Sequence, residues 1–334
     1  MADTIILAHG SGGKLTHDLI AKDILPFLEN PILNKLDDSA VFDLSGRLAF
    51  TTDSYVVNPI FFPGGDIGRL AVCGAINDLA MVGAAPQCLS LALIIEEGFV
   101  KEDLRKILNS IREAAKEAGV MVVTGDTKVV NHGAADKIFV TTSGIGVVPK
   151  GANISGSNAK PGDKIVLNGT IGDHGVTIMS QREGLKLAVP VQSDCAPLNL
   201  LAAKVLEESP KVRAMRDPTR GGLATTLNEF ALMSRVGISI NEAAIPVREA
   251  VRAACELLGF DPLYVANEGK MVAVVPSEDA ERVVSRMKKL RYGTDSAIIG
   301  EVTAENPGRV VLKTKLGTTR IVDMLTGELL PRIC

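Results

Sequence analysis

The stretch from residue 87 to residue 124 constrains the fold most. A nearly continuous apolar segment at 87–95 predicts a buried strand, and a second apolar segment at 120–124 predicts another. Between them, 101–118 has the spacing of an amphipathic helix. The apolar face of this helix is made of Leu104, Ile107, Leu108, Ile111 and Ala115. The order strand, helix, strand predicts an α/β fold.

A second set of strands and helices follows a loop at 150–162 that is rich in glycine, serine, asparagine and lysine. Such a stretch is the best candidate for a domain boundary, and a chain of 334 residues is long enough for two domains. Apolar segments at 164–168, 238–241 and 271–275, with helical patterns between them, predict a second α/β unit. We therefore expect an N-terminal domain at 1–155, a C-terminal domain at 156–315 and a mobile tail at 316–334.

Composition and charge argue against several classes of protein. The net charge of −3 gives no basic surface for nucleic acid or an anionic membrane. No apolar run is long enough to span a bilayer, and the N-terminus lacks the features of a secretion signal. The five cysteines are widely spaced without a CxxC pair, which argues against disulfides or a zinc site and for a reducing compartment. We expect a cytoplasmic protein.

Aspartates recur at the ends of apolar segments. Asp38, Asp53, Asp78 and Asp126 do so in the first half, and Asp217 begins the sequence DPTRGG in the second. Several carboxylates around a polyphosphate are a usual way to hold Mg²⁺, which prefers oxygen ligands. Aspartates in loops also cap helices and form Asx turns, so each of them alone has a structural alternative. Five of them, each beside glycine or another small residue, favour a metal–nucleotide site.

A glycine-rich loop at 9–14, HGSGGK, precedes a helical pattern. The backbone N–H groups of such a loop can bind phosphate, and Lys14 adds a positive charge. The spacing is not that of a Walker motif, and many glycine-rich loops are only turns. Of the four histidines, His9 and His174 stand in glycine-containing loops and are the candidates for lying near a ligand.

Three further side chains are candidates for chemical steps. Cys334, the last residue, is a thiol on a chain end, where chains are usually mobile. The adjacent α-carboxylate disfavours its thiolate, so something else must activate the thiol or deliver its cargo. Lys128 and Glu268, both close to glycines, are candidates for moving protons. The alternative for Cys334 is an incidental terminal residue, and for Lys128 and Glu268 an ordinary surface charge.

The motifs, taken in order, resemble a known family. The segments HGSGGK, DDSAV, TTDSYVV, NDLAMVGAAP, GDTKVV, DPTRGGLA and NEGK, with PRIC at the end, are similar to the HypE family of hydrogenase maturation factors. This family is a branch of an ATP-binding superfamily that includes aminoimidazole ribonucleotide synthetase and selenophosphate synthetase. The similarity covers essentially the whole chain, and the terminal segment 331–334 distinguishes this branch.

The resemblance implies a two-domain, PurM-like architecture, α/β (α+β) in class. The N-terminal domains pair in a homodimer to complete a β-barrel, the C-terminal domain is an α/β sandwich, and the tail is flexible. Long apolar strands in a half-barrel also need a partner sheet to cover their edges. The implied ATP-binding residues are Gly12, Gly13, Lys14, Asp38, Asp53, Asn77, Asp78 and Asp126. The implied Mg²⁺ ligands are Asp38, Asp53, Asp78, Asp126 and, as a weaker candidate, Asp217.

The resemblance also implies an activity. The terminal cysteine accepts a carbamoyl group from the carbamoyltransferase HypF, and the enzyme dehydrates this thiocarboxamide to a thiocyanate at the expense of ATP. The cyano group then passes to iron through the HypC–HypD complex, for [NiFe] hydrogenase. An amide oxygen is a poor leaving group, so its phosphorylation makes the loss of oxygen feasible. Cys334 is the implied reacting residue, with Glu268 and Lys128 as the bases that remove N–H protons.

Two other functions remain open at this point. A sibling of the same superfamily phosphorylates a small molecule instead. A selenophosphate synthetase, however, is expected to carry cysteine or selenocysteine beside the lysine of its N-terminal loop, whereas the first cysteine here is Cys73. A purine or thiamine kinase-like sibling has no use for a terminal cysteine. From a different class, the chain could be a carrier or scaffold that binds nucleotide only to regulate assembly.

Overall fold

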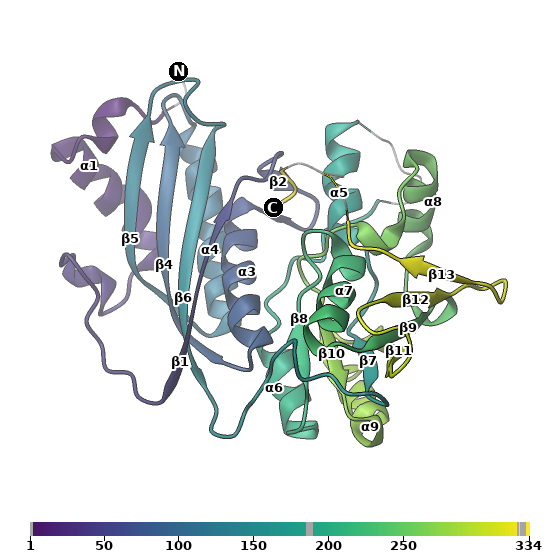
Figure 1. Cartoon of the computed structure of the whole chain (residues 1–334). Helices are drawn as coiled ribbons and strands as arrows, with labels where there is room; N and C mark the ends of the chain where they lie inside the picture. The colour runs from purple at the N-terminus through teal and green to yellow at the C-terminus, as the bar shows by residue number, and fades with distance from the viewer. Residues whose placement is uncertain (1–2, 185–189, 326, 328–331) are drawn as a thin grey trace.

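A computed structural model of the protein describes residues 3–184, 190–325, 327 and 332–334. Two α/β units lie side by side, one built on each half of the chain (Figure 1). The predicted α/β class and the presence of two units are confirmed. None of the helices in the described ranges is long and apolar enough to cross a membrane.

The first unit is a four-stranded sheet with helices on one face (Figure 1). Its strand order is β1 (Arg47–Tyr55), β6 (Ile138–Val148), β4 (Ala85–Glu96) and β5 (Met121–Val130). The helix predicted at 101–118 is α4 (Lys101–Ala118), which joins the parallel strands β4 and β5 and ends at Gly119 in the left-handed conformation. Its apolar face packs with α3 (Ile67–Met81) into the main core of this half.

The other face of this sheet is left open. Thr51 and Tyr55 point towards α3, where Thr51 bonds to Asp78 and Tyr55 lies against Gly74. Residues 50, 52 and 54 therefore point the opposite way, because side chains alternate along a strand, whereas Asp53 points to the α3 side. On that open face, Phe50 of β1 is 71% exposed and Ile94 of β4 is 40% exposed. Large exposed apolar side chains on one sheet face are typical of a surface that another protein covers.

The second unit is a seven-stranded sheet with helices on both faces. Its strand order is β13 (Thr319–Val322), β12 (Val310–Lys313), β9 (Gly237–Asn241), β11 (Ala297–Thr303), β7 (Lys164–Leu167), β10 (Val272–Val275) and β8 (Ala214–Arg216). Its helices are α5 (Asp173–Arg182), α6 (Asn199–Glu208), α7 (Gly222–Ser234), α8 (Glu249–Leu258) and α9 (Ser277–Met287). In β10, Val272 and Val274 pack on the α7 side, whereas Ala273 and Val275 pack on the α6 and α9 side. A strand buried on both faces explains the unbroken apolar run of its sequence.

Three elements differ from the expectation. β5 continues to Val130, because its pairing with β4 uses backbone groups and does not depend on apolar side chains, so Asp126 lies within a strand and not after it. Asp53, also expected at the end of a segment, lies within β1, which pairs with β6. Residues 319–322, expected in a mobile tail, form β13, because a turn at Gly317 folds them back onto β12.

The chain end lies at the junction of the two units (Figure 1). The backbone N–H of Val56 donates to the carbonyl of Cys334 at 3.2 Å, and that of Asn58 donates to Arg332 at 3.3 Å. Ile333 is 3% exposed and packs into the core of the first unit. Residues 328–331, part of the tail for which we expected mobility, lie outside the described residues.

Candidate active site

The thiol of the last residue points into the junction. Nη2 of Arg220, in the loop that precedes α7, donates to Sγ of Cys334 at 3.1 Å. Burial, followed by the nearby Glu268 carboxyl, raises the pKa of the Cys334 thiol to about 11, although Arg220 acts in the opposite direction. The docked thiol is therefore protonated at neutral pH. The α-carboxylate, which we expected to disfavour the thiolate, is not among the main causes.

The carboxyl group of Glu268 is buried, and one of its oxygens is unpaired among the described residues. Its side chain is 3% exposed, and Oε1 has no hydrogen-bond partner among the described residues. Burial first, and then the charges of Asp217, Asp194 and Asp53, raise its pKa well above the ordinary value. The structural alternative for Glu268, a solvated surface charge, is therefore wrong. An unsatisfied buried oxygen costs free energy unless a ligand supplies its partner.

The backbone of Glu268 is held from both sides. Its N–H donates to Oδ1 of Asp194 at 3.0 Å, and its carbonyl accepts from Nδ2 of Asn77 at 3.2 Å. Asn77 also donates to the carbonyl of Ala196 at 3.1 Å and accepts from the N–H of Leu198 at 2.8 Å. This side chain, expected at the nucleotide, is 1% exposed and joins the two units. Both amide atoms of Asn77 are thus engaged with backbone groups, among them that of Glu268.

Three of the five predicted aspartates gather near this site. Asp78 of α3 accepts from Oγ1 of Thr51 at 2.7 Å. Burial raises the pKa of Asp78, and Asp53 raises it further. Burial and then Asp78 raise the pKa of Asp217, which follows β8, to about 7. These carboxylates are near enough to repel one another and offer only oxygen atoms, so a cation between them would offset the repulsion.

The other two predicted aspartates lie elsewhere. One row of paired residues crosses the sheet from Asp53 of β1 through Thr142 of β6 and Leu91 of β4 to Gly125 of β5. Asp126 is the next residue and so points to the open face, roughly 14 Å away across three strand spacings. Asp38 stands in the exposed loop before β1. Within the described ranges, no three Asp, Glu, His or Cys side chains form a metal-binding group. The five predicted ligands therefore do not meet in a single chain.

Lys128 shares the open face with Asp126. Its Nζ lies 3.0 Å from Oδ1 of Asp126, and both side chains are exposed. The glycine-rich loop lies beside them, because Gly10 packs so tightly on β5 that an added Cβ would meet the backbone nitrogen of Val129 at 2.8 Å. This brings Gly12 and Asp126 to one depression, with Gly13 and Lys14 following at the start of α1 (Lys14–Leu19). In one chain, Lys128 is thus separate from Glu268 and Cys334.

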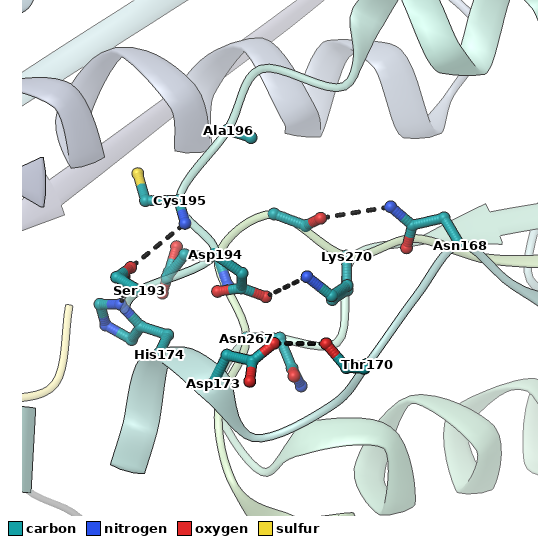
Figure 2. Close-up of polar contacts among 12 residues, drawn as sticks. Asn168, Thr170, Asp173, His174, Ser193, Asp194, Cys195, Ala196, Asn267 and Lys270 are labelled. Atoms are coloured by element: carbon teal, nitrogen blue, oxygen red, sulfur yellow. Dashed lines mark hydrogen bonds and ion pairs between the residues drawn. The ribbon is translucent and has the colours of Figure 1, made fainter. Parts of the chain in front are cut away.

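Sequence reasoning missed Arg220 and understated His174. His174 contacts the carbonyl of Ile333 through Nε2 at 2.7 Å, and its Nδ1 lies 2.8 Å from Oγ of Ser193 (Figure 2). Its place in a glycine-containing loop was the only signal. Arg220 carried none beyond the motif DPTRGG, because its contact is with the far end of the chain. His9, the other candidate, accepts from the N–H of Ile6 at 3.0 Å.

Comparisons with known proteins agree with this architecture. The model of the AIR synthase related protein, N-terminal domain, matches residues 36–148, and that of the C-terminal domain matches residues 160–313. The carbamoyl dehydratase HypE of Azotobacter vinelandii is 53% identical over 332 residues, which cover 99% of this chain and 97% of the relative. These matches confirm the two-domain, PurM-like α/β fold.

Solved structures give the same family. A hydrogenase maturation protein HypE in complex with ATP superposes with a TM-score of 0.96 at 50% identity, covering 99% of this chain and 100% of that one. The HypE chain of a HypE–HypF complex has a TM-score of 0.82 at 50% identity, covering 94% of this chain and all of that one. The chain belongs to the HypE family of hydrogenase maturation proteins, the carbamoyl dehydratases.

Proposed function

We propose that this enzyme carries a carbamoyl group on Cys334 and dehydrates it to a thiocyanate with ATP, which supplies the cyanide ligand for the iron of [NiFe] hydrogenase. The observation that carries this proposal is the position of the last thiol. Sγ of the half-buried Cys334 lies beside Arg220 and near Glu268, whose Oε1 has no partner among the described residues. A terminal thiol in such a place is suited to deliver cargo to a base.

The reaction needs a proton acceptor and the exclusion of water. The unpartnered Oε1 of Glu268 can accept a hydrogen bond from an N–H of the carbamoyl group. The raised pKa of Glu268 makes its carboxylate a stronger base. Ile333, packed into the core, closes the junction behind the cargo. Lys128 is the second proposed base, and it reaches the cargo only if another chain brings it there.

The proposed cofactors are ATP and Mg²⁺. ATP binding is supported by the relative whose structure is a complex with ATP. Asp53, Asp78 and Asp217 would hold the metal ion, which would offset charge on the phosphates. Asp38, Asp126 and the loop residues Gly12, Gly13 and Lys14 would complete the nucleotide site from the open face of a second chain. The exposed apolar side chains of that face support a homodimer in which the two sheets meet.

The proposed partners follow from the need to load and unload the tail. A carbamoyltransferase, HypF, would load Cys334, as the HypE–HypF complex of a relative supports. The HypC–HypD complex would receive the cyano group. Loading requires the tail to leave the junction, and the proposed domains, 1–155 and 156–315, would stay in place while the last residues move. We propose that these events take place in the cytoplasm.

Mass spectrometry of the last peptide tests the proposal. With HypF, the carbamoyl mass should appear on Cys334 and on none of the other cysteines, and adding Mg-ATP should then remove the mass of one water from that peptide. Cys334→Ala should fold and bind ATP but accept no carbamoyl group. Modification that lands on Cys73, Cys88, Cys195 or Cys255, or that persists in Cys334→Ala, would refute the proposal.

A further inference from the structure

Arg220 stands where the cargo of Cys334 would be. Its Nη2 donates to Sγ at 3.1 Å, and the carbamoyl oxygen is only two bonds from that sulfur. The carboxyls of Asp53 and Glu268 are near enough for their charges to act on the guanidinium. A group that already touches the sulfur in the unloaded tail can touch the oxygen of the loaded tail after a small side-chain rotation.

The backbone at Arg220 is held firmly by its neighbours. Gly221 and Gly222 both have positive φ angles, 80° and 62°, and begin α7. A Cβ at Gly222 would meet the carbonyl oxygen of Leu263 at 2.5 Å, so this turn packs directly on the backbone of residues 263–265. The depression beside Cys334 is lined by Arg220, Gly221 and Thr225. The guanidinium therefore extends into this depression from a fixed origin.

We infer that Arg220 is a catalytic residue of the dehydration: it binds the carbamoyl oxygen on Cys334 and stabilises the charge that gathers on it. This inference rests on the proposed function. A guanidinium keeps its charge and presents a planar fork of donors, which suits an amide oxygen and, later, a phosphoryl group on that oxygen. Glu268 would face the nitrogen of the same carbamoyl group. Its carboxylate would accept from the N–H, while the guanidinium of Arg220 would donate to the oxygen.

The carbamoyl oxygen attacks the γ-phosphorus of ATP, the new O–P bond forms, the bond to the β-phosphate oxygen breaks, and ADP leaves while one N–H proton passes to a base. The C–O bond then breaks and phosphate departs with its electron pair, as the second N–H proton is removed and C≡N forms. The net change converts the carbamoyl thioester and ATP into thiocyanate, ADP and phosphate. Arg220 would hold the oxygen in both steps.

Variants of Arg220 test this role in the full-length protein. Arg220→Ala and Arg220→Lys, carbamoylated on Cys334 by HypF or by cyanate, are mixed with Mg-ATP in single turnovers, and water loss is followed by mass spectrometry. Arg220→Ala should be slower by about 10²–10³-fold, as for the loss of one preorganised donor, and Arg220→Lys should be intermediate. ATP affinity by calorimetry should stay within about threefold in both. Free guanidinium should restore part of the rate to Arg220→Ala only.

Arg282→Gln is the matched control, since this arginine lies on α9 and pairs with Glu208 and Asp279. It should keep the parent rate. Water loss at the parent rate in Arg220→Ala would overturn the inference, and so would a slow variant that has lost ATP affinity or is not rescued by guanidinium. A parent protein that keeps its carbamoyl group under Mg-ATP would refute the proposed function itself, and this role with it.

Discussion

Nε2 of His174 lies 2.7 Å from the carbonyl oxygen of Ile333, so a buried side chain of α5 holds the last peptide of the chain. A carbonyl oxygen can only accept, so the proton of the neutral imidazole is on Nε2 and Nδ1 is an acceptor. Oγ of Ser193, which accepts from the N–H of Cys195 at 3.1 Å, therefore donates to Nδ1 (Figure 2). Burial lowers the pKa of His174, which keeps the ring neutral at pH 7.

Loss of this contact should loosen the tail. His174→Gln removes a hydrogen bond worth about 1 kcal/mol, which corresponds to a roughly fivefold higher population of undocked tail. Alkylation of Cys334 by iodoacetamide at pH 8 should therefore be faster by about that factor, as measured by mass spectrometry. The control His132→Gln changes a histidine that is 88% exposed and should leave the rate unchanged. An unchanged rate in His174→Gln would show that the tail is held without it.

Glu268→Gln should separate binding from chemistry. The variant should bind ATP like the parent, because its amide keeps the shape, but should form nitrile about 10²–10⁴-fold more slowly, because it cannot accept a proton. In the parent, the rate should rise with pH through the raised pKa of Glu268, since only the carboxylate is a base. The variant should lack this rise. A parent-like rate in Glu268→Gln, measured in single turnovers, would give Glu268 a structural role.

In the absence of a metal ion, repulsion among the aspartates should lower the stability of the fold. Because the pKa of Asp217 is raised to about 7, the contribution of its carboxyl group to the free energy of unfolding is most favourable below pH 4. This contribution is lost as pH rises towards 7. Asp217→Asn removes this penalty, so at pH 8 it should raise the thermal midpoint by a few degrees. Mg-ATP affinity should fall by ~10-fold or more. The control Asp43→Asn, in an exposed loop, should change neither. A variant with lowered stability, or with full Mg-ATP affinity, would contradict the assignment.

Periodicity was enough to predict the elements of the first unit, and motif order was enough to predict the family. The helix at 101–118 agrees with α4 because its apolar spacing faces a core made by neighbours in sequence. The end of β5 was placed too early, because the apolar pattern stops at Thr124 while the backbone pairing continues. That difference moves Asp126 and Lys128 from a strand end to the open face of the sheet.

The site could be predicted only as a set of residue types. Asp53 and Cys334 are far apart in the sequence and come near each other because the last residues pair with backbone that follows β1. No local pattern records such a contact, and for the same reason the arginine at Cys334 was missed. Glu268 was identified from its motif, but its burial depends on how the two units pack. Asn77 was assigned to the nucleotide, whereas its amide is committed to that packing.

The separation of Asp78 from Asp126 leads to a test with mixed dimers. If each ATP site takes Asp78 from one chain and Asp126 from the other, Asp78→Asn and Asp126→Asn should each be inactive alone. Co-expressed with two affinity tags and purified as a heterodimer, they should place both changes in one site and leave the other intact. Such a dimer should show about half of the parent ATP-dependent water loss.

The matched control pairs Asp78→Asn with Asp217→Asn, two changes on the same side of the sheet. In that heterodimer each site carries one change, so activity should not return. Phe50→Lys, on the open face, should yield a monomer by sedimentation, because a charge replaces an apolar side chain that the second sheet would cover. An inactive Asp78→Asn and Asp126→Asn heterodimer would mean that one chain completes its own site. The opposite faces of the sheet would then have to be joined by a movement within the chain.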